Sequence, residues 1–397
     1  MSAESSVLVV GASAAGLGVA EALRRKGHRG AVTVLGAEPH QPYDRPPLSK
    51  QILAGDWTPE RAWLRPPAAL AALDVDFVLG DRALALDPKS RSVHTESGRT
   101  LCADSIVVAT GLAPRTLPGQ ENLAGVHVLR TFDDALALRS ALPTCSRLVV
   151  VGEGVLAAEI AATARKLGVT VAMTGPQPAP LAAQLGPLAA GLLAELHAER
   201  GVSLRLGTAA SGLAGGDGRV TGVRLATGEV LPADLVVVAV GAAPVTDWLA
   251  GSGLCLDNGV VCDSRCQAAR GIYAAGDVAR WHHEGLDDLV RLENRTNATE
   301  QAVAVAANIL GADLPYKPVP YLWTDQYDTR IQVFGTPRPE DDVTVVDGAV
   351  GDRRFVALCR RDGAVTGVLG WNMPKQTRLR RQELLVPAPR TSGMAVL

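Results

Sequence analysis

Two glycine-rich turns have the residue types and spacing that bind the pyrophosphate of a dinucleotide. Each follows an apolar run, and the two are Gly11-Ala12-Ser13-Ala14-Ala15-Gly16 and Gly152-Glu153-Gly154-Val155-Leu156-Ala157. In such a turn the first glycine permits a tight bend, a small middle residue lets the backbone approach the phosphates, and the third small residue lets the following helix pack closely. The helix that starts there directs its free N–H groups at the phosphates. Two such turns in one chain predict a flavin that is reduced by a nicotinamide nucleotide.

Residues after the first turn also suit a bound nucleotide. Ser13 replaces the middle glycine but keeps the position small, and a helix over Leu17–Lys26 and a strand over Ala31–Leu35 are expected next. Glu38, just past that strand, can accept hydrogen bonds from a ribose diol. A βαβ unit without a ligand would also explain one such turn. A serine-hydrolase elbow is excluded, because position 15 is alanine rather than glycine.

Three more apolar strands end in glycine, as expected at the ligand-binding edge of a nucleotide-binding sheet. Their ends are Ala109-Thr110-Gly111, Gly241 and Gly276-Asp277. The carboxylate of Asp277 can accept a hydrogen bond from a sugar-alcohol hydroxyl. These strands predict an α/β fold with two Rossmann-like nucleotide-binding domains and a small C-terminal α/β domain.

The order of the motifs predicts the domain boundaries. We expect an FAD-binding domain over residues 1–112 and 243–318, an inserted NAD(P)H-binding domain over 113–242, and a C-terminal domain over 319–397. At ~150 residues per domain, a chain of 397 residues is long enough for this arrangement. In the C-terminal domain we expect a basic helix from Lys375 onward and strands over 331–334, 343–346, 355–359 and 365–370.

Composition narrows the class of protein. Lys and Arg number 39 against 41 Asp and Glu, so overall charge gives no reason to expect nucleic acid or lipid as a partner. No signal segment and no apolar run of the ~18 residues that a membrane span needs is evident, and we expect a cytoplasmic protein. The six cysteines form no Cys-x-x-Cys pair, so Cys262 and Cys266 are expected to be structural thiols. The seven histidines show no metal-binding spacing, and His282-His283 is expected in a polar loop.

One further segment, Tyr43-Asp44-Arg45-Pro46-Pro47-Leu48-Ser49-Lys50, carries a family resemblance. With the two turns and Gly276-Asp277, it resembles the FAD-dependent ferredoxin reductases of oxygenase systems, the putidaredoxin reductase and biphenyl dioxygenase ferredoxin reductase type. The resemblance runs nearly end to end and includes Leu129-Arg130-Thr131, Arg291-Leu292-Glu293 and Trp323-Thr324-Asp325-Gln326. It implies an enzyme that passes electrons from NAD(P)H through FAD to an iron-sulfur ferredoxin. That ferredoxin would serve a haem-thiolate monooxygenase or a ring-hydroxylating dioxygenase.

The resemblance also implies which residues surround the flavin. They are Ala15, Ala37, Lys50, Ala83, Arg130, Asp277 and Arg295, with Gly11, Gly16, Glu38, Thr110 and Gly111 around them. Relatives carry Trp or Val at position 295, so Arg295 would add a cation near the flavin and favour its reduced, negatively charged form. Arg45 and Lys50 can neutralise the pyrophosphate or the reduced flavin. A solvated turn is the alternative for both.

Two residues are implied at the point of hydride transfer. Glu159 is expected to face the flavin and pair with Lys50, whereas the alternative is a solvent-facing position on its helix. Trp323 is expected to cover the nicotinamide side or the edge of the flavin, and its alternative is a core position.

The choice of nicotinamide nucleotide is less clearly encoded. The strand over 169–173 ends in Thr174-Gly175, where a site for NADH usually offers Asp or Glu, and no arginine nearby suits a 2′-phosphate. Glu153 puts negative charge close to the pyrophosphate, which would weaken nucleotide binding. We expect NADH with low discrimination, and NADPH as a second donor.

A basic segment suggests where the acceptor docks. Eight cations and one anion, Asp362, are found from Arg353 to Arg381, and they would steer an acidic ferredoxin; a solvated helix face is the alternative. Two other functions share this architecture. A flavoprotein of the apoptosis-inducing-factor type would act by redox-dependent association. A disulfide or peroxide reductase would need a cysteine near the flavin, where the first domain offers only Cys102. The oligomeric state is left open.

Overall fold

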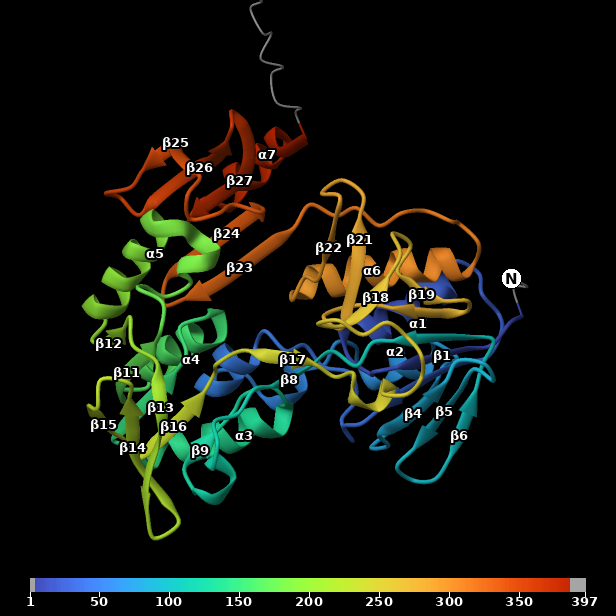
Figure 1. Cartoon of the computed structure of the whole chain (residues 1–397), viewed down its shortest axis with the longest axis horizontal. Coiled ribbons are helices and arrows are strands. Elements are labelled where there is room, and N and C mark those ends of the chain that lie inside the picture. Colours follow the sequence, from blue (N-terminus) through green and yellow to red (C-terminus); the bar gives the residue numbers. More distant parts are fainter. Residues whose placement is uncertain (1–3, 386–397) are drawn as a thin grey trace, which may run out of the picture. The chain divides into compact units, whose positions relative to one another are not determined.

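The computed structural model describes residues 4–385, which group into two compact units (Figure 1). The first unit contains Met1–Leu48, Asp56–Pro114 and Ala242–Pro318, and the second contains Ser49–Gly55, Arg115–Gly241 and Val319–Leu397. The predicted α/β class is confirmed. The three-domain division stays a prediction, because the segments expected to form the NAD(P)H-binding and C-terminal domains fall in one unit. Within residues 4–385, no helix has the length and hydropathy to cross a membrane.

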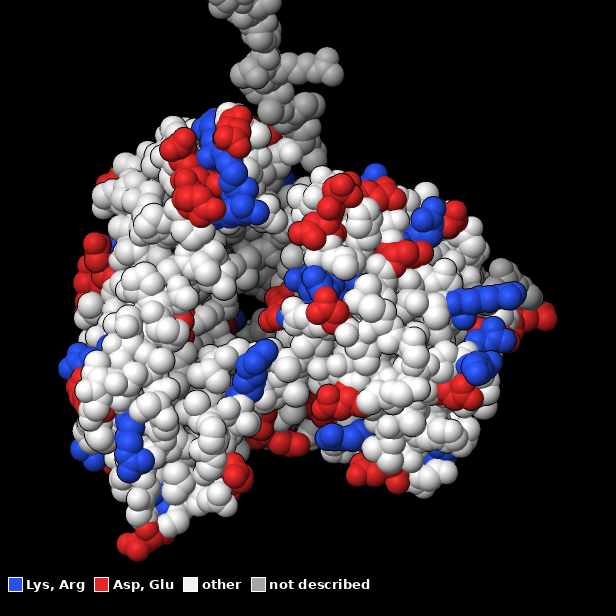
Figure 2. Space-filling model, viewed as in Figure 1, with Lys and Arg blue, Asp and Glu red and all other residues white. Residues whose placement is uncertain are grey.

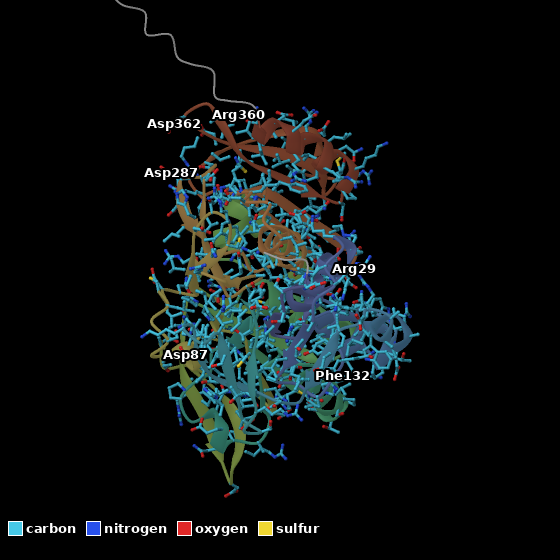
Figure 3. All side chains as sticks on the ribbon, turned by 90° about the vertical axis from the view of Figure 1, so that its right-hand side faces the viewer. Arg29, Asp87, Phe132, Asp287, Arg360 and Asp362 are labelled. Atoms are coloured by element: carbon cyan, nitrogen blue, oxygen red, sulfur yellow. The ribbon has the colours of Figure 1, made fainter. Side chains whose placement is uncertain are left out.

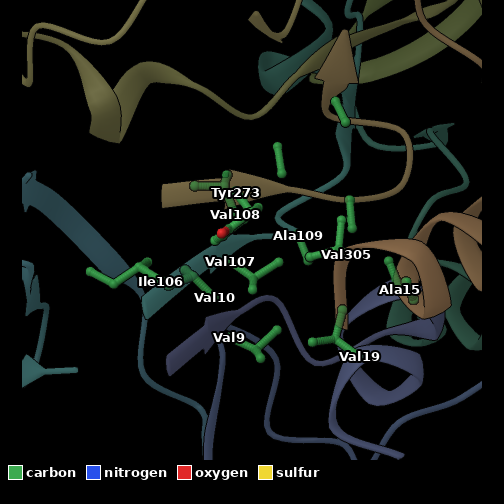
Figure 4. Close-up of a cluster of buried hydrophobic side chains, with 14 of the residues drawn as sticks. Val9, Val10, Ala15, Val19, Ile106, Val107, Val108, Ala109, Tyr273 and Val305 are labelled. Atoms are coloured by element: carbon green, nitrogen blue, oxygen red, sulfur yellow. The ribbon is translucent and has the colours of Figure 1, made fainter. Parts of the chain in front are cut away.

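A six-stranded sheet forms the core of the first unit. Its strand order is β19-β20-β7-β1-β2-β3, and β1 pairs in parallel with β2 and β7. All residues of β1 and β7 are buried, as expected when helices cover both faces of a parallel sheet. Valines of these strands face Val19 and Val305 of two neighbouring helices (Figure 4). The elements are β1 (Val7–Val10), α1 (Ala14–Arg25), β2 (Val32–Gly36), β3 (Asp76–Leu79), β7 (Ser105–Val108), β19 (Gln267–Ala269), β20 (Ile272–Ala274) and α6 (Arg295–Ile309).

The predicted start of the first helix is wrong by three residues. The helix begins at Ala14 rather than Leu17, because Ser13 has an extended backbone and acts as its N-cap. The helix N-terminus therefore comes directly out of the glycine turn. This places the free N–H groups of α1 closer to the turn than the sequence pattern indicated.

Smaller elements complete the first unit. They are α2 (Pro67–Ala71), β4 (Ala83–Asp87), β5 (Ser92–Thr95), β6 (Thr100–Cys102), β8 (Leu112–Pro114), β17 (Ala242–Pro244), β18 (Val260–Cys262), β21 (Ala279–His283) and β22 (Asp288–Val290), with short helical turns at Pro59–Ala62 and Asp247–Leu249. A further helical turn, Leu48–Ile52, starts at the last residue of this unit's first segment and continues in the second unit. The loop expected at His282-His283 is wrong, since both residues belong to β21. His283 is buried and its Nε2 lies 2.9 Å from the Pro318 carbonyl oxygen.

A five-stranded parallel sheet forms one part of the second unit, with the order β12-β11-β10-β16-β9. An antiparallel sheet, β13-β14-β15, adjoins it. The elements are β9 (Val126–His127), α3 (Phe132–Ala141), β10 (Arg147–Val151), α4 (Val155–Lys166), β11 (Thr170–Gly175), α5 (Ala182–Glu199), β12 (Ser203–Leu206), β13 (Ala210–Gly216), β14 (Arg219–Leu225), β15 (Val230–Pro232) and β16 (Leu235–Val238), with short helical turns at Gln120–Asn122 and Leu142–Thr144.

The C-terminal part of the same unit is a five-stranded antiparallel sheet of order β23-β24-β27-β26-β25. Its four predicted strands and its basic helix are present, while the predicted domain end at 386–397 lies outside the described residues. Ion pairs join it to α5: Arg353 to Glu199 at 2.6 Å and Arg200 to Asp328 at 3.0 Å. The elements are β23 (Tyr321–Gln326), β24 (Thr329–Gly335), β25 (Asp342–Ala349), β26 (Arg354–Arg361), β27 (Ala364–Trp371), α7 (Pro374–Arg380) and a helical turn at Arg381–Leu385.

Candidate functional site

The first glycine turn has the close backbone approaches that a dinucleotide site requires. Gly11 has a φ of +124°, and a Cβ there would lie 2.1 Å from the Ala109 carbonyl oxygen. At Gly16 a Cβ would lie 1.7 Å from the Gly11 carbonyl oxygen. Side chains are therefore excluded at both positions. The turn stays tight, and the N-terminus of α1 remains next to the end of β1.

The acidic residue after β2 is held in place by two donors. Tyr43 Oη donates to Glu38 Oε2 at 2.5 Å, and Arg45 Nη2 donates to Glu38 Oε1 at 2.9 Å. Arg45 also donates to the Ser13 hydroxyl. The Arg45 side chain is 26% exposed, so it differs from the solvated turn that was its alternative. Arg45 thus connects the glycine turn to the carboxylate expected to bind ribose.

The Gly276-Asp277 ending lies beside the first turn. A Cβ on Gly276, whose φ is +78°, would be 2.9 Å from the Ala15 Cβ. The Gly276 N–H donates to Gln301 Oε1 at 2.8 Å, and Gln301 Nε2 donates to Cys266 Sγ at 3.3 Å. Burial raises the pKa of Cys266 to about 12, which fits a structural thiol. The sequence gives no signal for Gln301, since it is one of several polar residues on α6 and belongs to no motif.

Arg295 is paired with an acid rather than free. Its Nε donates to Asp44 Oδ1 at 2.6 Å, and its guanidinium also donates to the Thr299 hydroxyl. The predicted cation therefore belongs to a neutral pair with the Tyr43–Leu48 segment. Its effect on a flavin stays a prediction.

The second unit contains a buried pair of the two predicted catalytic residues. Lys50 Nζ lies 2.8 Å from Glu159 Oε2, and the Glu159 side chain is 6% exposed. The solvent-facing alternative for Glu159 is therefore wrong. Ser49 Oγ donates to the same Oε2 at 2.5 Å, and Thr324 Oγ1 donates to Oε1 at 2.9 Å. Thr163 in turn donates to the Ser49 carbonyl oxygen at 2.8 Å, so one helix fixes both the carboxylate and its partners.

A chain of hydrogen bonds leads from Thr324 to the β23–β24 turn. Gln326 Nε2 donates to Thr324 Oγ1 at 3.1 Å, which leaves Gln326 Oε1 as an acceptor, 2.7 Å from His197 Nε2. Burial lowers the pKa of His197, so the ring is neutral with its proton on Nε2. His197 Nδ1 then accepts from Tyr327 Oη at 3.1 Å. Every donor in this chain points toward Glu159.

Thr324 and Gln326 belong to a sequence motif that assigns them no role, and no sequence signal points to His197 or Tyr327. These residues lie far apart along the chain, so their spacing carries no signal. Trp323, on the same strand, is half-buried and stacks on Tyr321 with ring centroids 5.8 Å apart.

The second glycine turn repeats the geometry of the first. Gly152 has a φ of +127°, and a Cβ there would lie 2.2 Å from the Ala239 carbonyl oxygen. A Cβ on Gly154, by contrast, would have no atom of the described residues within 4 Å, so this glycine leaves open space beside the turn. Gly241 closes the unit with a φ of +99° at the end of the β16 segment.

The remaining predicted cofactor residues are divided between the units. Ala37, Ala83, Ala109, Thr110 and Gly111 are in the first, whereas Lys50, Arg130 and Trp323 are in the second. Thr110 Oγ1 donates to the Val245 carbonyl oxygen at 2.8 Å, which ties the two strand ends of the first unit together. Whether all of them line one flavin stays a prediction.

The basic C-terminal segment is partly neutralised. Acids from outside the counted stretch pair with three of its arginines: Glu199 with Arg353, Asp341 with Arg361, and Asp347 and Glu383 with Arg380. Figure 2 shows basic and acidic side chains next to one another over this sheet, and Figure 3 shows Arg360 and Asp362 together at its edge. The cationic surface is thus smaller than the sequence indicated, because folding brings in acids that are distant along the chain. Lys375 and Arg378 remain exposed on α7.

These features define a class: an α/β flavoprotein fold with one dinucleotide-binding turn in each unit. Residues 5–302 match the model of the pyridine nucleotide-disulphide oxidoreductase family, and residues 321–388 match the reductase C-terminal model. The chain is 35% identical over 392 residues to rhodocoxin reductase of Rhodococcus erythropolis, covering 98% of this chain and 92% of that protein. It is 36% identical over 380 residues to the ferredoxin reductase component of a chlorobenzene dioxygenase from a Cupriavidus species, covering 93% and 90%.

A solved structure agrees with these relatives. The reductase in the covalent putidaredoxin reductase-putidaredoxin complex superposes with a TM-score of 0.90 at 34% identity, covering 96% of this chain and 93% of that one. The chain belongs to the pyridine nucleotide-disulphide oxidoreductase family and is similar throughout to its ferredoxin reductases. It is an oxidoreductase of the kind that uses FAD and NAD(P)H. The two glycine turns fit these groups, since each turn lies tightly against a neighbouring strand end, where any Cβ at Gly11 or Gly152 would overlap the carbonyl of Ala109 or Ala239.

Proposed function

We propose that this protein transfers electrons from NAD(P)H through FAD to an iron-sulfur ferredoxin that serves an oxygenase. The observation that carries the proposal is the presence of two dinucleotide turns, each at the end of a strand that pairs in parallel with both of its neighbours. The names of the similar proteins, a rhodocoxin reductase and a dioxygenase ferredoxin reductase, support the same acceptor. The terminal enzyme is a haem-thiolate monooxygenase or a ring-hydroxylating dioxygenase.

FAD, when bound, supplies the chemistry of accepting a hydride and releasing its electrons singly. The protein's part is to hold and orient the reacting groups. In the first unit, Glu38 would bind the adenosine ribose and the N-terminus of α1 would face the pyrophosphate. The other contacts proposed for this unit would be made by Ala15, Ala37, Ala83, Thr110, Asp277 and Arg295.

Lys50 is the group we assign to the reacting edge of the flavin. Glu159 orients Lys50, because its Oε2 lies 2.8 Å from the Lys50 Nζ. Ser49 and Thr324 donate to that carboxylate, so both oxygens of the buried Glu159 side chain have a hydrogen-bond partner. Arg130 and Trp323 are proposed to complete the flavin site.

The acceptor is proposed to dock through cations that the fold leaves exposed. Lys375 and Arg378 of α7 are the candidates, and they would steer an acidic ferredoxin in a salt-dependent manner. Charge reversal of both should raise the apparent KM for putidaredoxin at low salt, with little change at high salt. An unchanged KM at low salt would place docking elsewhere.

We also propose that the protein works in the cytoplasm. NAD(P)H is available there, and thiols such as those of the six free cysteines stay reduced.

Reduction of a ferredoxin is the direct test. The purified holoenzyme is mixed with NADH and putidaredoxin, and cluster reduction is followed by absorbance, with cytochrome c as the final acceptor. Turnover that requires the added ferredoxin supports the proposal. Slow flavin reduction with a long-lived charge-transfer complex and no ferredoxin-dependent turnover would support a signalling flavoprotein instead. Turnover with a disulfide or peroxide alone would identify a reductase of that class.

A further inference from the structure

The strand that usually carries the ribose-binding acid ends here in glycine. In dinucleotide-binding units, an Asp or Glu roughly 20 residues after the glycine turn accepts hydrogen bonds from the adenosine ribose. That place is the end of β11, which is Gly175 in this chain. A positive φ does not explain the glycine, since Gly175 lies outside the left-handed region.

Glu153, from the middle of the second glycine turn, takes the space of the missing side chain. A Cβ built on Gly175 would lie 1.6 Å from Glu153 Oε2, 2.5 Å from its Cδ and 3.3 Å from its Cβ. The carboxylate of Glu153 therefore lies over the end of β11, where a side chain at position 175 would otherwise begin. Gly175 is buried beneath it.

The surrounding backbone holds Glu153 in this position. The Gly152 N–H donates to the Thr174 carbonyl oxygen at 2.7 Å, which joins the turn to the end of β11. The Leu181 N–H donates to the Glu153 carbonyl oxygen at 2.9 Å. The backbone N–H of Gln177 binds the carboxylate, while partial burial raises the pKa of Glu153. The side chain is half-buried, so a ligand can still reach it.

The charges near this carboxylate do not suit a phosphate. Residues 176–184, which follow β11, contain neither lysine nor arginine. Arg205 lies opposite Thr174 on β12, but its Nε is 3.6 Å from Glu229. A 2′-phosphate at the end of β11 would meet the negative charge of Glu153, whereas a 2′-hydroxyl could donate to it.

We propose that Glu153 supplies the ribose-binding carboxylate that the end of β11 lacks, and that it makes this protein selective for NADH over NADPH. The inference deepens the proposed function and rests on the use of a nicotinamide nucleotide. It makes Glu153 a specificity-determining residue. From its place in the turn alone, Glu153 was expected only to weaken binding by repelling the pyrophosphate.

Binding of redox-inert ligands tests this without turnover. ADP-ribose and 2′-phospho-ADP-ribose are titrated into the oxidised holoenzyme by calorimetry. Wild type should prefer ADP-ribose, and Glu153→Gln should lower that preference roughly tenfold, since a hydrogen bond to a charged group is lost and a repulsion is removed. Retention of the full preference by E153Q would overturn the inference.

A transplant variant separates recognition from a structural role. Glu153→Gly combined with Gly175→Glu moves the acid to the strand end, and it should restore the preference for ADP-ribose. Gly175→Glu alone should bind both ligands poorly, because its Cβ would collide with the Glu153 carboxylate. FAD content and melting temperature serve as folding controls for all variants. A transplant that keeps its FAD and folds normally but shows no preference would contradict the inference.

The two proposals fail in different ways. Wild type that binds both ligands equally would overturn the role of Glu153 and leave the reductase function standing. Wild type that binds neither ligand and is not reduced by NADH would overturn the proposed function itself.

Discussion

The two dinucleotide-binding units have the same glycine turn but hold their acidic residues differently. In the first, Glu38 follows the strand end and Arg45 and Tyr43 hold it, while Asp44 is paired with Arg295. In the second, Glu153 reaches the strand end from within the turn, and Glu159 is held by two hydroxyls and one lysine. Steric contacts thus constrain the backbone of each glycine turn, whereas the charged side chains near it can come from several segments of the chain.

The largest expected effect comes from adding one methyl group to either turn. Gly11→Ala should abolish FAD binding, because the new Cβ would overlap the Ala109 carbonyl and φ would be strained. Gly152→Ala should keep FAD but weaken binding of ADP-ribose by on the order of 100-fold or more. Flavin absorbance and calorimetry measure the two results. If G152A loses FAD as well, the two turns do not serve separate nucleotides.

The next effect concerns the acid of the second unit. Glu159→Ala should slow flavin reduction by NADH by roughly 10- to 100-fold while FAD stays bound, since Lys50 loses the partner that orients it. Stopped-flow absorbance measures the rate. Thr324→Val should give a smaller loss, because Ser49 still donates to the carboxylate. An unaltered rate in E159A would remove Glu159 and Lys50 from the reacting site.

Arg295 tests the electrostatics of the first unit. Arg295→Val should lower the midpoint potential of the flavin by about 30 mV, the equivalent of roughly 1.4 kcal/mol for a two-electron couple. The reason is that loss of the cation leaves the negative charge of Asp44 unbalanced, which disfavours the reduced flavin. Asp44→Asn is the matched control and should raise the potential. A raised or unchanged potential in R295V would place this pair away from the flavin.

The smallest effect is a pH dependence that belongs to the second unit. Burial lowers the pKa of His197 below its ordinary value of 6.5, so the folded protein binds its proton less readily than the unfolded chain. The free energy of unfolding therefore keeps its full value above pH 6.5 and falls as the pH drops below 6.5. The loss is about 1 kcal/mol for each unit by which the pKa in the folded protein lies below 6.5. Melting temperatures measured from pH 7.5 to 5 should fall less steeply in His197→Gln than in wild type. Burial also lowers the pKa values of His28 and His127, so the melting temperature of the His197→Gln variant should still fall somewhat with pH. Equal slopes in both proteins would remove His197 from the acid response.

Much of the nucleotide-binding scaffold could be predicted from local sequence. Gly11 and Gly152 adopt backbone angles that other residues rarely take, and the apolar runs before them can only be buried strands. The four C-terminal strands were also predictable, because alternation and turn residues act over a few neighbours. Lys50 and Glu159 required more than spacing, since their pairing came from a family resemblance.

The sequence could not predict which acidic and basic side chains pair with one another. The count of eight cations against Asp362 overestimated the basic surface, because Glu199, Asp341, Asp347 and Glu383 are supplied by other segments. Likewise, the sequence shows no acid at position 175, whereas in the fold the Glu153 carboxylate lies over Gly175.

By itself, the sequence determined where the backbone turns and which strands are buried, since these depend on sterics and hydrophobicity within short segments. Only the tertiary structure decided which charges are neutralised, which carboxylate reaches the end of β11, and which hydroxyls hold Glu159. Coulombic and hydrogen-bonding interactions depend on distances of a few ångströms between atoms. Those distances are fixed by packing residues that are far apart along the chain.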